Sequence, residues 1–136
     1  MPSDPSSPLP PAAAVTFART LLSLSEYERC HSVLSSSSSP LASLPPAGRF
    51  LRWYSRFLAG EKRKEEEIVE LSDPAERCRV ANPYLPSLCA ELAGAHAGDD
   101  LDHAGLYMYG VVLKERLQQQ ASLAGGKDGE GGGGGG

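Results

Sequence analysis

The sequence has few of the residues that build metal sites or catalytic centres. Its 136 residues include three cysteines, Cys30, Cys78 and Cys89, an odd number with no Cys-x-x-Cys pair. This spacing argues against a disulfide framework and against a zinc site, so we expect free thiols in a reducing compartment. There is also no G-x-S-x-G, no P-loop sequence and no H-E-x-x-H. We therefore expect no enzyme activity, no cofactor and no metal.

Basic charge and long apolar runs are also scarce. Lys and Arg number 13 against 17 Asp and Glu, which gives a net charge of −4. Such a chain has no basic excess to attract a nucleic-acid backbone. A membrane-spanning helix needs about 20 consecutive apolar residues, and no such run is present. We expect neither a nucleic acid nor a membrane as a partner.

Large apolar residues are scarce at both ends of the chain. Residues 1–13 are rich in Pro, Ser and Ala, and residues 118–136 are Gln followed mostly by Gly. Neither segment can bury enough apolar surface to offset the conformational entropy that ordering costs. We predict a disordered lead at 1–13, a helical region at 14–117 and a disordered tail at 118–136. A Ser- and Pro-rich loop at 35–46 lies inside the helical region.

An eight-residue helical pattern occurs three times in the helical region. A large apolar residue is followed directly by a small one, and further apolar or small residues stand three positions before and after this pair. The small residue is Ala18, then Ser55, then Gly110. The spacing places all four positions on one helix face. It is also the first half of the tetratricopeptide signature, a repeat of about 34 residues. Both intervals exceed this length, so we predict an irregular array, although unrelated amphipathic helices would show the same spacing.

The second half of the signature follows the first pattern. Cys30 stands where the small residue of a second helix belongs, and Leu34 takes the apolar position four residues later. We predict that residues 12–24 and 26–35 form antiparallel helices, with Cys30 facing Ala18.

A third predicted helix covers residues 47–59 and is the most aromatic segment. A core face is the simplest interpretation, and a base-stacking platform is the alternative. That alternative needs surrounding positive charge, which only three arginines supply: Arg49, Arg52 and Arg56. We expect Gly60 to cap this helix, with a charged helix following as far as Leu71.

The residues predicted to pack within and between repeats are the apolar and small side chains of these patterns: Phe17, Ala18, Leu21, Tyr27, Cys30, Leu34, Tyr54, Ser55, Leu58, Leu106, Tyr109, Gly110 and Leu113. For the last of the three patterns, the Gln- and Gly-rich sequence that follows cannot supply a second helix. Because a repeat unit cannot bury its apolar face alone, we expect part of this face to be exposed unless residues 83–93 cover it.

Two longer segments resemble one family. Residues 54–67, YSRFLAGEKRKEEE, are similar to the Y-S-R-[YF]-L-[SA]-G-E-K-[KR]-K segment of anaphase-promoting complex subunit 8, the cell-division-cycle protein 23. Residues 105–113, GLYMYGVVL, resemble that family's G-L-Y-L-Y-G-V-V-L, and residues 25–29 resemble its K-E-Y-D-R turn. The resemblance covers about residues 15–117.

This resemblance implies an all-α superhelical scaffold, made of tetratricopeptide-like helical hairpins, inside a large ubiquitin ligase of the cell cycle. It implies no catalysis by the subunit itself, other subunits of the complex as partners, a homodimer through the N-terminal repeats, and a location in nucleus and cytoplasm. Since the family continues with many more repeats, we expect this chain to be an N-terminal fragment, and no docking residues of later repeats can be carried over. The alternative is a generic tetratricopeptide adaptor with a peptide groove lined by the three arginines.

Overall fold

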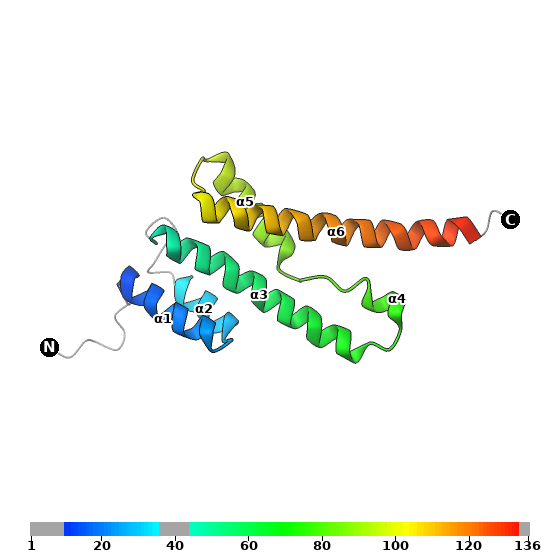
Figure 1. Ribbon diagram of the computed structural model, residues 1–136, viewed down its shortest axis with the longest axis horizontal. Helices are drawn as coiled ribbons and strands as arrows, with labels where there is room; N and C mark the ends of the chain where they lie inside the picture. Colours follow the sequence, from blue (N-terminus) through cyan, green and yellow to red (C-terminus); the bar gives the residue numbers. More distant parts are fainter. Residues whose placement is uncertain (1–9, 36–43, 134–136) are drawn as a thin grey trace. The chain divides into compact units, whose positions relative to one another are not determined.

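The computed structural model of the chain describes residues 10–35 and 44–133, with side chains as far as residue 124. All regular secondary structure among these residues is α-helical (Figure 1), which confirms the predicted all-α class. The described helices are α1 (Pro11–Ser23), α2 (Tyr27–Leu34), α3 (Pro46–Glu70), α4 (Pro74–Arg77), α5 (Leu85–Ala97) and α6 (His103–Gly133). The chain forms two compact units, Met1–Ala59 and Gly60–Gly136, and the division between them falls within α3.

Proline is the first residue of α1, α3 and α4. Pro11 is the first residue of α1, inside the segment predicted as the lead, and Pro46 is the first residue of α3. Proline suits this position because its missing N–H would have no partner in the first turn and its φ angle is already helical. The helices therefore begin slightly before the predicted residues. The parts of the predicted lead, loop and tail at 1–9, 36–43 and 134–136 lie outside the described residues.

The turn between α1 and α2 is closed by Ser25. Its φ of 61° is left-handed. The Glu26 N–H donates to the Leu21 carbonyl at 2.9 Å, and the Ser25 N–H donates to the Leu22 carbonyl at 3.0 Å. This pair of bonds is a Schellman motif, which satisfies the last carbonyls of a helix and usually uses Gly at the left-handed position. The reversal lets α1 and α2 pack against each other as the predicted antiparallel pair (Figure 1).

The core of the first unit joins side chains from α1, α2 and α3 with one residue that precedes α3. Its members are Val15, Ala18, Leu21, Cys30, Leu34, Leu44 and Leu51. Ala18 and Cys30 are each 0% exposed within this cluster, as expected of two small residues that allow two helices to approach closely. The prediction that Cys30 faces α1 is confirmed.

Helix α3 does not end at Gly60, so the predicted cap is wrong. The helix continues to Glu70 without interruption. A Cβ atom at Gly60 would overlap the side-chain amide of Asn82. The glycine therefore stands inside the helix because another segment of the second unit approaches its backbone there, which is a packing role rather than a terminating one.

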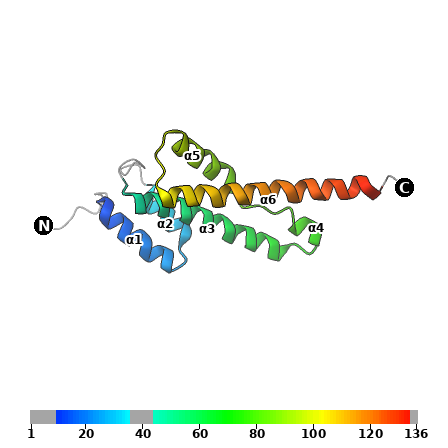
Figure 2. The same cartoon turned by 45° about the horizontal axis from the view of Figure 1, so that its top comes forward.

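In the second unit, α5 lies along α6 in both views (Figures 1 and 2). Leu88 and Leu92 are the most deeply buried side chains of α5, and Met108 and Val112 those of α6. Each pair is four residues apart, which is the spacing of one helix face. The short α4 precedes them and is capped by Asp73, whose Oδ1 accepts from the Ala75 N–H at 3.0 Å.

Helix α6 runs beyond Leu117, so the predicted boundary between helical region and tail lies inside the helix. Gln119 gives a physical reason, because its side-chain Nε2 donates to the carbonyl of Arg79 at 3.1 Å. This tertiary contact holds a turn that composition alone assigned to the tail. Across the described residues, none of the helices combines the length and the apolar content that a membrane crossing needs.

Candidate functional site

The first two small-residue patterns meet in the first unit. Ala18 from α1, Cys30 from α2 and Ser55 from α3 are each 0% exposed. Burial raises the pKa of the Cys30 thiol, and its hydrogen bond with Ser55 opposes this rise only in part. The Ser55 hydroxyl also donates to the Arg52 carbonyl at 3.1 Å. The thiol is thus protonated and unreactive at neutral pH, and these residues serve close helix packing.

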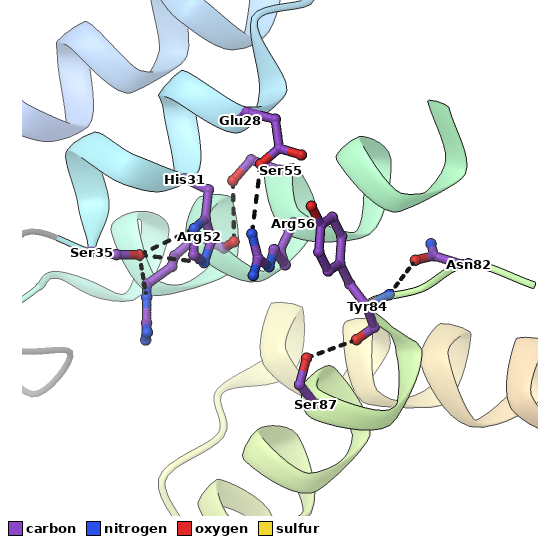
Figure 3. A network of polar contacts seen from close by, with 9 residues as sticks. All are labelled: Glu28, His31, Ser35, Arg52, Ser55, Arg56, Asn82, Tyr84 and Ser87. Carbon is purple, nitrogen blue, oxygen red and sulfur yellow. Dashed lines mark hydrogen bonds and ion pairs between the residues drawn. The ribbon is translucent and has the colours of Figure 1, made fainter. Parts of the chain in front are cut away.

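A polar cluster borders this packed core (Figure 3). We call it the α2–α3 polar cluster: Glu28, His31 and Ser35 on the α2 side, and Arg52 and Arg56 on α3. Arg56 Nη1 lies 3.6 Å from Glu28 Oε2, and Arg52 Nε donates to the Ser35 hydroxyl at 2.9 Å. The His31 ring nitrogens lie 3.3 and 3.4 Å from the same hydroxyl oxygen. Sequence patterns did not indicate this cluster, since its members are ordinary polar residues at no recognised spacing.

His31 is held neutral in the cluster. Burial, together with the charges of Arg56 and Arg52, lowers its pKa to about 4 against the opposing charge of Glu28. A neutral imidazole can accept a hydrogen bond from the Ser35 hydroxyl, because one of its nitrogens carries no proton. The cluster therefore places the Arg52 guanidinium against the Ser35 hydroxyl, with Arg56 one helical turn further along α3.

A second set of polar contacts lies within the second unit, where Asn82 is 2% exposed. Its Oδ1 accepts from the Tyr84 N–H at 3.0 Å, a contact drawn in Figure 3, and its Nδ2 donates to Glu61 Oε1 at 3.3 Å. The Arg63 guanidinium lies 5.3 Å from the Tyr84 ring centroid, within cation–π range. Because Gly60 has no side chain, the Asn82 amide packs against its backbone. Asn82 thereby connects the segment before α5 to α3. The sequence carried no signal for this buried Asn.

The third small-residue pattern is placed differently from the first two. Leu106 is 44% exposed, Leu113 is 37% exposed, and a Cβ at Gly110 would have no neighbour within 4 Å. Tyr109 is half-buried, with its ring centroid 5.5 Å from that of His96. Part of the predicted face is therefore exposed, as expected. The segment at 83–93 does fold onto this helix, but α5 covers the other side of it, where Met108 and Val112 are buried.

The remaining predicted packing residues fall into three groups. Leu21 and Leu34 are buried, whereas Phe17 is 41% exposed and points away from the core that Ala18 enters. Tyr27, Tyr54 and Leu58 are half-buried, and Tyr54 stacks on Phe50 with centroids 5.5 Å apart. Trp53, at 2% exposed, is the most buried aromatic of α3. The core interpretation of this helix is confirmed for that residue. No group of three His, Cys, Asp or Glu side chains suited to a metal ion occurs in the described part.

Known proteins are similar to this chain over most of its length. A family model described as anaphase promoting complex subunit 8 / Cdc23 matches residues 12–124. The cell division cycle protein 23 homologs of Homo sapiens and Bos taurus are each 39% identical over 102 residues, 75% of this chain and 16% of the relative. Anaphase-promoting complex subunit 8 of Arabidopsis thaliana is 36% identical over 122 residues, 90% of this chain and 21% of the relative. The chain thus spans about a fifth or less of the length of these relatives.

Proposed function

The chain belongs to the anaphase promoting complex subunit 8 / Cdc23 family, and from this premise we propose that it acts as a scaffold subunit of the anaphase-promoting complex, a cell-cycle ubiquitin ligase. The observation that carries the proposal is the family match over residues 12–124, which includes both compact units. A scaffold of helical repeats works through the faces that its helices present to neighbours.

We propose that the chain contributes no catalytic residue to the ligase. Two groups within residues 10–35 and 44–124 have clearly shifted pKa values, and both support this. Cys30 has a raised thiol pKa and no exposed surface, so it makes a poor nucleophile. His31 has a pKa of about 4 and bonds to Ser35, so it makes a poor general base near neutral pH. Both are used in packing two helices together.

The partners we propose are other subunits of the complex, and a second copy of the chain through the N-terminal hairpin. Two exposed apolar surfaces support these contacts. Phe17 on α1 is 41% exposed, and Leu24, which caps the end of that helix, is 65% exposed. On α6, the exposed residues Leu106, Leu113 and Leu117 form a surface that we call the α6 stripe. Exposed apolar stripes of this kind mark protein–protein contacts. For the location we propose nucleus and cytoplasm, where a cell-cycle ligase and its substrates meet.

Affinity capture from mitotic cells tests the scaffold proposal. We expect the tagged chain to co-purify subunits of the anaphase-promoting complex. Leu113→Glu should reduce this capture at least fivefold, because a carboxylate on the α6 stripe opposes an apolar contact. Lys114→Glu is the matched control, since Lys114 is exposed on the same helix. Capture of no subunit by the wild-type chain would contradict the proposal. Equal capture by wild type and Leu113→Glu would exclude the α6 stripe.

The alternative, a generic peptide-binding adaptor, is less well supported. Its groove would need the arginines of α3, but Arg52 and Arg56 are engaged in the α2–α3 polar cluster with Ser35 and Glu28. Arg49 is half-buried. The family match gives the scaffold role a specific complex, whereas nothing among the residues that the structure describes identifies a peptide ligand.

A further inference from the structure

We propose that Ser35 is a phosphorylation site, and that its phosphate monoester is bound in place by the α2–α3 polar cluster. Ser35 directly follows the last residue of α2 and is half-buried. Its hydroxyl is the point on which the cluster converges: Arg52 Nε lies 2.9 Å away, and the two His31 ring nitrogens lie 3.3 and 3.4 Å away. Figure 3 shows the three side chains grouped around this oxygen.

The cluster offers more positive charge than a neutral hydroxyl requires. Arg52 and Arg56 are both on α3, one helical turn apart, and Arg56 also pairs with Glu28 at 3.6 Å. Guanidinium groups bind phosphate through paired N–H donors, and these charge-assisted bonds are stronger than the bond that Arg52 now makes to a hydroxyl. A phosphate on Ser35 would thus meet the Arg52 guanidinium, which already contacts the Ser35 oxygen.

The chemical step is an ordinary phosphoryl transfer from ATP by a protein kinase. The Ser35 oxygen forms a bond to the γ-phosphorus while the bond from that phosphorus to the β–γ bridging oxygen breaks. The hydroxyl proton goes to the kinase base or to solvent, and ADP leaves. No other reactant is needed.

One effect opposes the bound phosphate. A dianion at the C-terminal end of α2 faces the negative end of the helix dipole, which is unfavourable. This interaction is screened and confined to the last turn, whereas the Arg52 guanidinium, already at the Ser35 oxygen, would act directly on the phosphate. The Arg contacts should therefore dominate, and phosphorylation should tighten the junction between α2 and α3 rather than open it.

His31 should report the modification. Its pKa of about 4 reflects burial and the charges of Arg56 and Arg52, against the opposing charge of Glu28. These are the charged groups of α2 and α3 that act on the ring. A phosphate beside it adds negative charge, which favours the imidazolium, so the pKa of His31 should rise by about 1–3 units.

The test uses the full chain with phosphoserine installed at Ser35 during synthesis, and phosphoserine at Ser32 as the matched control. Ser32 lies on the exposed side of the same helix. The second pKa of a phosphoserine is about 6. In a ³¹P NMR titration we expect this pKa to fall by about one unit at Ser35, and to stay near 6 at Ser32. Arg52→Gln should return the Ser35 value most of the way to 6, and Arg52→Lys should return it only partly.

Three outcomes would overturn the proposal. The first is a ³¹P titration that gives the same second pKa for phosphoserine at Ser35 and at Ser32. The second is an equal rise of the His31 pKa when inorganic phosphate is added to the unmodified chain, because the cluster would then be a site for free anions. The third comes from mass spectrometry of the protein purified from dividing cells. Since Ser36, Ser37, Ser38 and Ser39 follow directly, fragment ions must place the phosphate on Ser35, and its absence there would contradict the assignment.

Discussion

The same eight-residue pattern has opposite outcomes in the two units of this protein. In the first unit, Ala18 and Ser55 are each 0% exposed and stand at the centre of helix packing. In the second unit, Gly110 occupies the equivalent position but is exposed, with open space where its Cβ would be. A local pattern defines one face of a helix, but it does not determine whether a neighbour covers that face.

The difference comes from where each helix finds its partner. Helix α1 is followed by α2, which returns along it and brings Cys30 to Ala18. Helix α6 is instead covered by α5, which precedes it in the chain, and the buried positions are Met108 and Val112. Met108 and Val112 are each two positions from Gly110, which places them on the opposite face of the helix. The rotation of α6 therefore differs from the one that its pattern predicts.

The largest expected effect is at the centre of the first unit. Ser55→Leu should lower the free energy of unfolding by about 1–3 kcal/mol, because a large side chain must enter a fully buried site. Chemical denaturation with a helical circular-dichroism signal measures this. Gly110→Leu in α6 is the control, and it should cause no comparable loss. Equal losses at both positions would remove the distinction between the two units.

Gly60 provides a second contrast, this time with a glycine of the same unit. Gly60→Ala should destabilise the protein by roughly 1–3 kcal/mol, because its Cβ would overlap the buried Asn82 amide, which cannot move without breaking its bonds to Tyr84 and Glu61. Thermal melts of Gly60→Ala and Gly110→Ala would measure the effect. If Gly60→Ala raised the melting temperature as a gain in helix propensity would, Asn82 could not be packed against this backbone.

The pH dependence of stability should be set in the first unit, by His31. Its pKa is about 4 when folded, against about 6.5 when unfolded. Between these values the unfolded chain binds more protons, so stability is complete above pH 6.5 and is lost as the pH falls toward 4. We expect a loss on the order of 1–2 kcal/mol after allowance for solvent screening. His31→Gln should flatten this part of the profile.

The smallest effect is expected at the exposed glycine itself. Gly110→Ala should stabilise the protein by about 0.5–1 kcal/mol, since Ala is the better helix former and no atom blocks its Cβ. The measurement is the urea midpoint at constant m-value. A loss of stability here would mean that a neighbour covers this face in solution, and would bring the two units closer in character.

Much of the local structure could be predicted from the residues in order. The spacing of apolar side chains located the helices, and Cys30 followed by Leu34 correctly paired α2 with α1. The ends of the helices differed from the predicted ones. Helices α1 and α3 begin one residue early, at Pro11 and Pro46, because proline suits the first helical position. Helix α6 continues past Leu117, where Gln119 bonds to the Arg79 carbonyl. These displacements depend on a few backbone groups, which periodicity does not register.

The sequence by itself thus determined an all-helical chain, its first hairpin and, through two longer motifs, its family. Only the tertiary structure decided which face of α6 is buried, why Gly60 stands inside a helix, and that Ser35, His31 and Arg52 converge on one point. The physical reason is the range of the interactions. Helix formation depends on residues three or four positions apart, whereas burial of a face and the pKa of His31 depend on side chains that other segments bring near.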